Sequence, residues 1–163
     1  MKLRSLFVTC VVFVAACSPS TPETPSDAAN TEGALQGVDI GADIREVMAR
    51  EQDHIIHQMP AEITTRILND QDSTYHEITY FAEGDTVCAV EMVVRPPSPV
   101  RGLQLHQQFV DYYSVQYGTA DTVERALQWT AHTDLQPLLE IALHNRLTSS
   151  HPNLLLTFHQ VAP

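Results

Sequence analysis

The chain is poor in lysine, glycine and cysteine, residue types on which several common kinds of functional site depend. It contains one lysine (Lys2), six glycines and three cysteines among 163 residues. With so few glycines there is no phosphate-binding loop, and no Gly-x-Ser-x-Gly nucleophile motif occurs. The apolar run at residues 6–14 is about half of the roughly 20 residues that a transmembrane helix needs. These absences argue against a nucleotide-binding enzyme, a serine hydrolase of that type and a membrane span formed by this run.

The first seventeen residues have the layout of a secretory signal peptide. Lys2 and Arg4 precede the apolar run, and the small pair Ala15-Ala16 precedes Cys17. A cysteine directly after small residues resembles the signal of bacterial lipoproteins, in which the chain is cut before the cysteine and the new terminal cysteine carries palmitate-type acyl chains. We therefore expect residues 1–16 to be removed and Cys17 to be lipidated. A plain secretory signal with a coincidental cysteine is the alternative interpretation.

The mature chain is strongly acidic. Without residues 1–16 it has seven arginines, no lysine and twenty acidic residues, a formal charge of −13. This charge argues against nucleic-acid binding and against electrostatic adhesion to anionic lipid. Cys88 is then the one unmodified thiol, so no internal disulfide is expected. Strand alternation puts Cys88 on an apolar face with Val90 and Met92, which predicts a buried structural thiol.

Composition divides the mature chain into a tether and a domain. Residues 17–39 comprise the lipidated cysteine and a stretch rich in proline, serine and threonine, which we expect to be disordered because it offers few apolar groups to bury. Residues 40–163 are expected to form a single domain, whose size of about 120 residues suits one core.

Hydrophobic periodicity predicts two helices and six strands in the domain. Asp43 and Glu46 form a capping pattern for a helix over 43–52, with residue 57 as its furthest end. A second helix is expected over 101–117, with Gly118 as its C-terminal cap. Its apolar stripe is expected to contain Leu103, His106, Val110, Tyr113 and Tyr117, with Phe109 beside them. The expected strands lie at about 62–69, 74–81, 86–94, 123–129, 139–143 and 154–158.

Helix followed by three strands occurs twice in this order, which predicts a pseudo-repeat of topology. Each helix has one apolar stripe, and each set of strands has one apolar face that must be buried. The predicted fold class is therefore α+β, a two-layer structure with two helices packed on one face of a roughly six-stranded antiparallel sheet. The opposite face is left to solvent or to a ligand.

The layout resembles small bacterial outer-membrane lipoproteins with a fold like that of the β-lactamase inhibitor protein. The segment Gly41-Ala42-Asp43-Ile44-Arg45-Glu46-Val47, the helix end Tyr117-Gly118 and the strand with Trp129 carry the resemblance, which covers residues 40–160. The strand regions of this chain are longer than in the smallest such proteins. The resemblance implies a binding or assembly role without catalysis.

Candidate metal ligands gather in one short segment. If the first helix continues to residue 57, Asp53 and His57 lie four residues apart on one face, and Glu51 and His54 lie three apart. This is only part of a four-ligand set, so no metal is expected, and polar side chains on the surface at a helix end are the favoured interpretation. No cofactor and no catalytic residue is expected either.

Three further histidines and one arginine lie in or beside the predicted elements. His106 is expected in or at the edge of the core, and His144 and His159 are expected near each other on the solvated strand face opposite Leu143 and Phe158. Alternation places Arg125 on the face of Leu127 and Trp129, where either stacking on the tryptophan or a position at the sheet edge is open; the edge is favoured.

Together these features predict a non-enzymatic lipoprotein anchored in the outer membrane and facing the periplasm. It is expected to bind an envelope protein through a sheet face or a strand edge, as a protein-binding or assembly module. Two alternatives stay open. One is an inhibitor or immunity-type lipoprotein that uses a loop such as 131–137, and the other is a metal-binding lipoprotein that uses His54 and His57.

Overall fold

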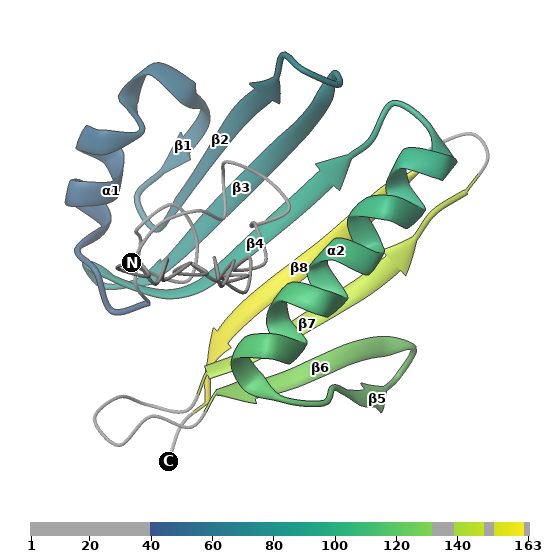
Figure 1. Ribbon diagram of the computed structural model, residues 1–163. Coiled ribbons are helices and arrows are strands. Elements are labelled where there is room, and N and C mark those ends of the chain that lie inside the picture. The colour runs from purple at the N-terminus through teal and green to yellow at the C-terminus, as the bar shows by residue number, and fades with distance from the viewer. Residues whose placement is uncertain (1–39, 132–138, 149–151, 162–163) are drawn as a thin grey trace, which may run out of the picture.

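The computed structural model describes residues 40–131, 139–148 and 152–161. These residues form an α+β fold with one antiparallel sheet, two α-helices and one short 3₁₀ helix (Figure 1). The helices are α1 (Ile44–Arg50), η2 (Gln52–His54) and α2 (Pro99–Tyr117). The strands are β1 (Ile55–Met59), β2 (Glu62–Asn69), β3 (Thr74–Glu83), β4 (Thr86–Arg95), β5 (Asp121–Val123), β6 (Ala126–Ala131), β7 (Leu139–Arg146) and β8 (Asn153–Gln160).

The sheet has eight strands in the order β1-β2-β3-β4-β8-β7-β6-β5. Each half of the domain is a helix followed by a four-stranded meander whose last strand lies at the centre of the sheet. The two halves meet where β4 pairs antiparallel with β8, with Val90 opposite Phe158 and Met92 opposite Leu156. The predicted α+β class with an antiparallel sheet is confirmed, and a topological repeat is present, but its unit is a helix with four strands.

The prediction of six strands was wrong because each half has one more strand at the sheet edge. Strand β1 begins at Ile55, within the segment up to residue 57 that was predicted as a possible continuation of the first helix. Strand β5 was merged with β6, although a tight turn at Glu124 and Arg125 separates them. Both turn residues have positive φ, 48° and 74°, which is the backbone of a two-residue hairpin turn. Glycine or asparagine normally signals such a turn, and neither is present here.

Helix α1 begins as predicted and ends early. The Asp43 carboxylate accepts a hydrogen bond from the Arg45 backbone N–H at 2.8 Å, which is the expected N-cap. Hydrogen bonds from the Arg45 side chain and backbone lower the pKa of Asp43 to about 2. The helix ends at Arg50, and after η2 the β-branched Ile55 pairs with Thr65 in β2. Sheet pairing is therefore preferred to helix continuation in this segment.

Helix α2 starts two residues before its predicted start. Ser98 caps it by accepting a hydrogen bond from the Arg101 backbone N–H at 3.2 Å, and Pro99 occupies the first turn. The Gly118 cap is confirmed, with φ of 88°. The buried stripe of α2 is Gly102, Leu105, Phe109 and Tyr113. Of the residues predicted for this stripe, Tyr113 and the adjacent Phe109 are fully buried, whereas Leu103 is 58% exposed.

Side chains from both helices and from one face of the sheet form a single core cluster. The ring of Tyr113 in α2 lies 5.5 Å from that of Trp129 in β6 and 6.1 Å from that of Phe158 in β8. Figure 1 shows α2 lying across β7 and β8. At the other end of the sheet, Ile44 and Val47 of α1 are buried in the same cluster. Both helices therefore cover one face, as the sequence predicted.

A β-bulge changes the predicted environment of Cys88. The pairing of β3 with β4 shifts between Phe81, which lies opposite Ala89, and Ala82, which lies opposite Val87. Cys88 is the extra residue, so Val87 takes the buried position that alternation had assigned to Cys88. The prediction of a buried thiol was wrong, because Cys88 is half-buried and its Sγ donates to the Phe81 carbonyl at 3.5 Å.

None of the helices in the described residues is both long enough and apolar enough to cross a membrane.

Candidate functional site on the helix-free face of the sheet

The face of the sheet that points away from α1 and α2 is the candidate site. We call it the helix-free face, because no helix in the described part of the chain covers it. Strand pairing arranges its side chains in rows across the sheet. One row runs through Arg66, Glu77, Val93, Leu155, His144 and Ala126. The next row towards the centre runs through Thr64, Thr79, Glu91, Thr157, Ala142 and Gln128.

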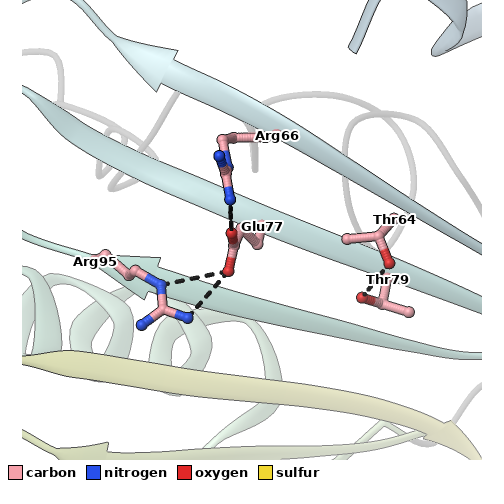
Figure 2. Close-up of polar contacts among 5 residues, drawn as sticks. All are labelled: Thr64, Arg66, Glu77, Thr79 and Arg95. Atoms are coloured by element: carbon pink, nitrogen blue, oxygen red, sulfur yellow. Dashed lines mark hydrogen bonds and ion pairs between the residues drawn. The ribbon is translucent and has the colours of Figure 1, made fainter. Parts of the chain in front are cut away.

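Two arginines bind one carboxylate on this face (Figure 2). Arg66 in β2 donates to Oε1 of Glu77 in β3, from Nε at 3.2 Å and from Nη2. Arg95 in β4 donates to Oε2 of the same carboxylate, from Nε at 3.3 Å and from Nη2 at 3.1 Å. The Glu77 side chain is 17% exposed, whereas those of Arg66 and Arg95 are 51% and 39% exposed. The carboxylate is thus enclosed by two guanidinium groups that still reach solvent.

These contacts determine the ionisation of Glu77. Burial acts to raise the pKa of this carboxyl, but the hydrogen bonds from Arg66 and Arg95 outweigh it and lower the pKa below its usual value. The same hydrogen bonds raise the pKa of Arg66. All three groups are therefore charged at neutral pH, and the cluster carries a net charge of about +1.

Tyr75 and a pair of threonines make further contacts on this face. The guanidinium carbons of Arg66 and Arg95 lie 5.5 and 5.9 Å from the centre of the Tyr75 ring, within the range of cation–π contacts. One row away, the hydroxyls of Thr64 and Thr79 are hydrogen-bonded at 3.1 Å (Figure 2). Side chains from three neighbouring strands are therefore linked by ion pairs, cation–π contacts and a hydrogen bond.

The predicted strand histidines lie on this face. His144 is opposite Leu155 and His159 is opposite Glu140, so the two histidines are in different rows of the β7–β8 pair, four residues apart along β7. The prediction that they share the sheet face opposite Leu143 and Phe158 is confirmed. The expectation that they lie near each other was wrong, because their separation along the strands prevents direct contact.

The segment with candidate metal ligands does not have the predicted geometry. Glu51 is 4% exposed and accepts a hydrogen bond from Arg50 Nε at 3.0 Å, whereas Asp53 and His54 are exposed. His57 lies in β1, so Asp53 and His57 do not share the face of a helix. Glu51 and His54 do span one 3₁₀ turn, in which the His54 N–H donates to the Glu51 carbonyl at 2.8 Å, but only the Glu51 side chain is buried. In the part of the chain that the structure describes, no group of three or more histidine, cysteine, aspartate or glutamate side chains is placed to hold a metal ion.

The remaining predicted positions are dispersed. Arg125 lies in the β5–β6 turn, so its predicted position at the sheet edge is confirmed. The prediction that it shares a strand face with Trp129 was wrong. His106 is half-buried on α2, where burial lowers its pKa. Cys17 and nearly all of the loop 131–137 lie outside the described residues.

A second surface feature lies between α1 and β1. It is an open hollow of about 520 Å³ lined by Arg45, Met48, Ala49, Gln52, Ile55 and Gln58. Arg45 at its rim is engaged by Asp43 and Asp85, at 2.6 and 3.4 Å. The hollow is therefore lined by both polar and apolar side chains, and its charged lining residue, Arg45, is paired with two carboxylates.

The sequence did not single out Arg66, Glu77 or Arg95, although one signal for the first pair was present. Residues 70–73 form the turn between β2 and β3, and Asn69 pairs with Thr74. Counting outward from that turn places Arg66 opposite Glu77, which is a favourable cross-strand charge pair. Arg95 could not be placed in this way, because the bulge at Cys88 shifts the register between β3 and β4.

No family model matches the chain, and no similar curated protein or solved structure was found.

Proposed function

We propose that this protein is a non-enzymatic binding module of the bacterial envelope, anchored in the outer membrane by lipid at Cys17 and docked to a partner protein through its helix-free face. The observation that supports the docking surface best is the preformed cluster of Arg66, Glu77 and Arg95 on a sheet face without a covering helix. One-sided antiparallel sheets usually leave such a face to solvent or to a partner. The proposed location rests on the signal-like residues 1–17.

The shape and polarity of the face suit a protein partner better than a small substrate. Its central part contains small side chains that are buried, Ala142 and Thr157, beside Glu91. Its rim carries arginines, glutamates and threonines that can form hydrogen bonds. Small buried side chains bordered by polar ones are common in protein–protein interfaces. The resemblance to lipoproteins with a fold like that of the β-lactamase inhibitor protein, noted from the sequence, also implies binding without catalysis.

The proposal is tested by partner capture that depends on this face. The tagged chain is expressed in its own envelope, treated with formaldehyde and purified, and the co-purifying proteins are identified. We expect one reproducible partner whose recovery falls at least tenfold when Glu91, at the centre of the face, is changed to arginine. Leu103→Arg, on the exposed side of α2, is the control and should leave recovery unchanged. Equal recovery with both variants would exclude the helix-free face as the docking surface.

The anchor is tested separately by mass spectrometry of the N-terminal peptide from native membranes. We expect a peptide that begins at Cys17 and carries acyl chains, and none from Cys17→Ser. An unmodified Cys17 in the native chain contradicts the proposed location without bearing on the helix-free face.

A further inference from the structure

Charge on the helix-free face is divided along the strand direction. Arg66 lies in one row, and the next row outward contains Tyr75 opposite Arg95 and, across the sheet, Arg146 opposite Asn153. We call this part, with Glu77, the basic end of the face. Glu91 lies in a row farther in, and Glu62 and Glu140 lie in the row at the opposite end. Three of the seven arginines of a mature chain with charge −13 are thus gathered in one area.

The basic end has more hydrogen-bond donors than its own carboxylate can use. Each guanidinium has five N–H donors, and Arg66 and Arg95 each direct Nε and Nη2 towards Glu77. Both side chains are exposed to solvent by more than a third. Their packing on Tyr75 limits their rotamers, so less side-chain entropy is lost when a second acceptor binds.

We propose that the basic end binds a glutamate- or aspartate-bearing extended segment of the partner protein, with the partner's carboxylates accepting hydrogen bonds from Arg66 and Arg95. This inference rests on the proposed function and names the chemistry of the partner. The arginines and the partner's carboxylates are complementary in charge, and one guanidinium group can donate two parallel hydrogen bonds to one carboxylate. Leu68, which is 58% exposed and lies opposite Tyr75, adds an apolar contact for a neighbouring side chain of the segment.

The test uses the full mature chain with Cys17→Ser, which keeps it soluble, and a fluorescein-labelled hexaglutamate peptide as the probe. Binding is followed by fluorescence anisotropy at low ionic strength. Arg95→Gln is expected to weaken binding about fivefold or more, the scale of one charge-assisted hydrogen bond. Arg125→Gln removes the same charge from the β5–β6 turn and is expected to weaken binding less than about twofold. Equal losses in the two variants would show that only net charge matters and would overturn the proposal.

A second pair of variants tests the role of Glu77. Glu77→Gln releases both guanidinium groups and is expected to tighten peptide binding about threefold or more. Glu91→Gln makes the same charge change one row away and is expected to have a smaller effect. Weaker peptide binding in a folded Glu77→Gln variant than in the unchanged chain overturns the proposal. If unfolding measurements show that this variant has lost its structure, Arg66→Gln is used in its place. Arg66→Gln should weaken peptide binding, and unchanged binding in this variant overturns the proposal.

The chain's own acidic residues before the domain are the competing occupant. Glu23, Asp27, Glu32 and Asp39 are changed together to their amides in the full chain. If peptide affinity then rises more than about tenfold, the basic end is filled by the chain itself and the proposal is wrong. Unchanged affinity supports an external partner. If no hexaglutamate binds while partner capture still depends on Glu91, this inference fails and the proposed function stands.

Discussion

The carboxylate of Asp72 accepts a hydrogen bond at 2.7 Å from Nε of Arg101, which follows it by 29 residues. Asp72 also accepts one from the Thr74 backbone N–H at 2.9 Å and so closes the turn between β2 and β3. Arg101 lies in the first turn of α2. This ion pair therefore joins the first meander, which carries the Arg66–Glu77 pair, to the helix of the second half.

Loss of this link should destabilise the domain. We expect Asp72→Ala to lower the free energy of unfolding by about 1–2 kcal/mol, because it removes both the ion pair and the turn hydrogen bond. Arg101→Ala should cost about 1 kcal/mol or less, because both groups are partly exposed. Urea unfolding followed by circular dichroism gives these values. Asp111→Ala, which removes only an exposed bond from Gln107, is the control, and equal losses at Asp72 and Asp111 would contradict the assignment.

Stability should fall in mild acid because of Asp72 and Glu77. Burial opposes the shift at both residues, but hydrogen bonds from arginines and, at Asp72, from Thr74 lower both pKa values in the folded state. A carboxyl whose pKa is lower in the folded state stabilises the fold at pH values above its pKa in the unfolded chain, which is about 4. This stabilisation is lost as the pH falls through the pKa of the folded state. We expect the urea midpoint to decrease below about pH 4.5.

The double variant Asp72→Asn, Glu77→Gln should be less stable at pH 7 and should show a smaller decrease in acid. A decrease as steep as that of the unchanged chain would assign the acid sensitivity to other carboxyls.

The hydroxyl of Tyr113 should be dispensable for stability. Within the described residues this buried oxygen has no hydrogen-bond partner, and burial raises its pKa. We expect Tyr113→Phe to leave the free energy of unfolding unchanged or to increase it by up to about 1 kcal/mol, because an unsatisfied buried group is removed. Tyr113→Ala should cost about 3–5 kcal/mol through the cavity beside Trp129 and Phe158. A loss above 1 kcal/mol in Tyr113→Phe would show that the hydroxyl has a partner.

A change of residues in the β5–β6 turn should increase the stability of the domain. Glu124 and Arg125 both adopt positive φ, which is unfavourable for residues with a side chain. Replacing the pair by Asn-Gly should stabilise the domain by about 1 kcal/mol, as measured by thermal or urea unfolding. Placing Asn-Gly at Gln71 and Asp72, in a turn that already contains an aspartate contact to Thr74, should not stabilise it. No gain at residues 124 and 125 would contradict the hairpin assignment.

Local signals in the sequence were sufficient for most of the fold. The Asp43 and Gly118 caps and the alternation of Leu154, Leu156 and Phe158 identified a helix start, a helix end and a core strand. They succeeded because a cap or a buried strand face depends on adjacent residues. The edge strands were missed because β1 has apolar residues that also suit a helix and because the β5–β6 turn lacks glycine.

The candidate site was less predictable because it depends on register between strands. Arg66 and Glu77 meet through one hairpin, which a count from the turn can recover. Arg95 reaches the same carboxylate only because β4 contains the extra residue Cys88, and a bulge is not evident from alternation.

The most direct test of the account is photo-cross-linking from the helix-free face in intact envelopes. Benzoylphenylalanine is placed at Thr64, beside the cluster of Arg66, Glu77 and Arg95, and in a separate strain at Val115, which is 68% exposed on α2. The account predicts a single discrete adduct from Thr64 upon irradiation, lost in Arg66→Gln, Arg95→Gln chains, and none from Val115. An adduct from Val115 alone, or from neither position in a folded and anchored chain, would contradict it.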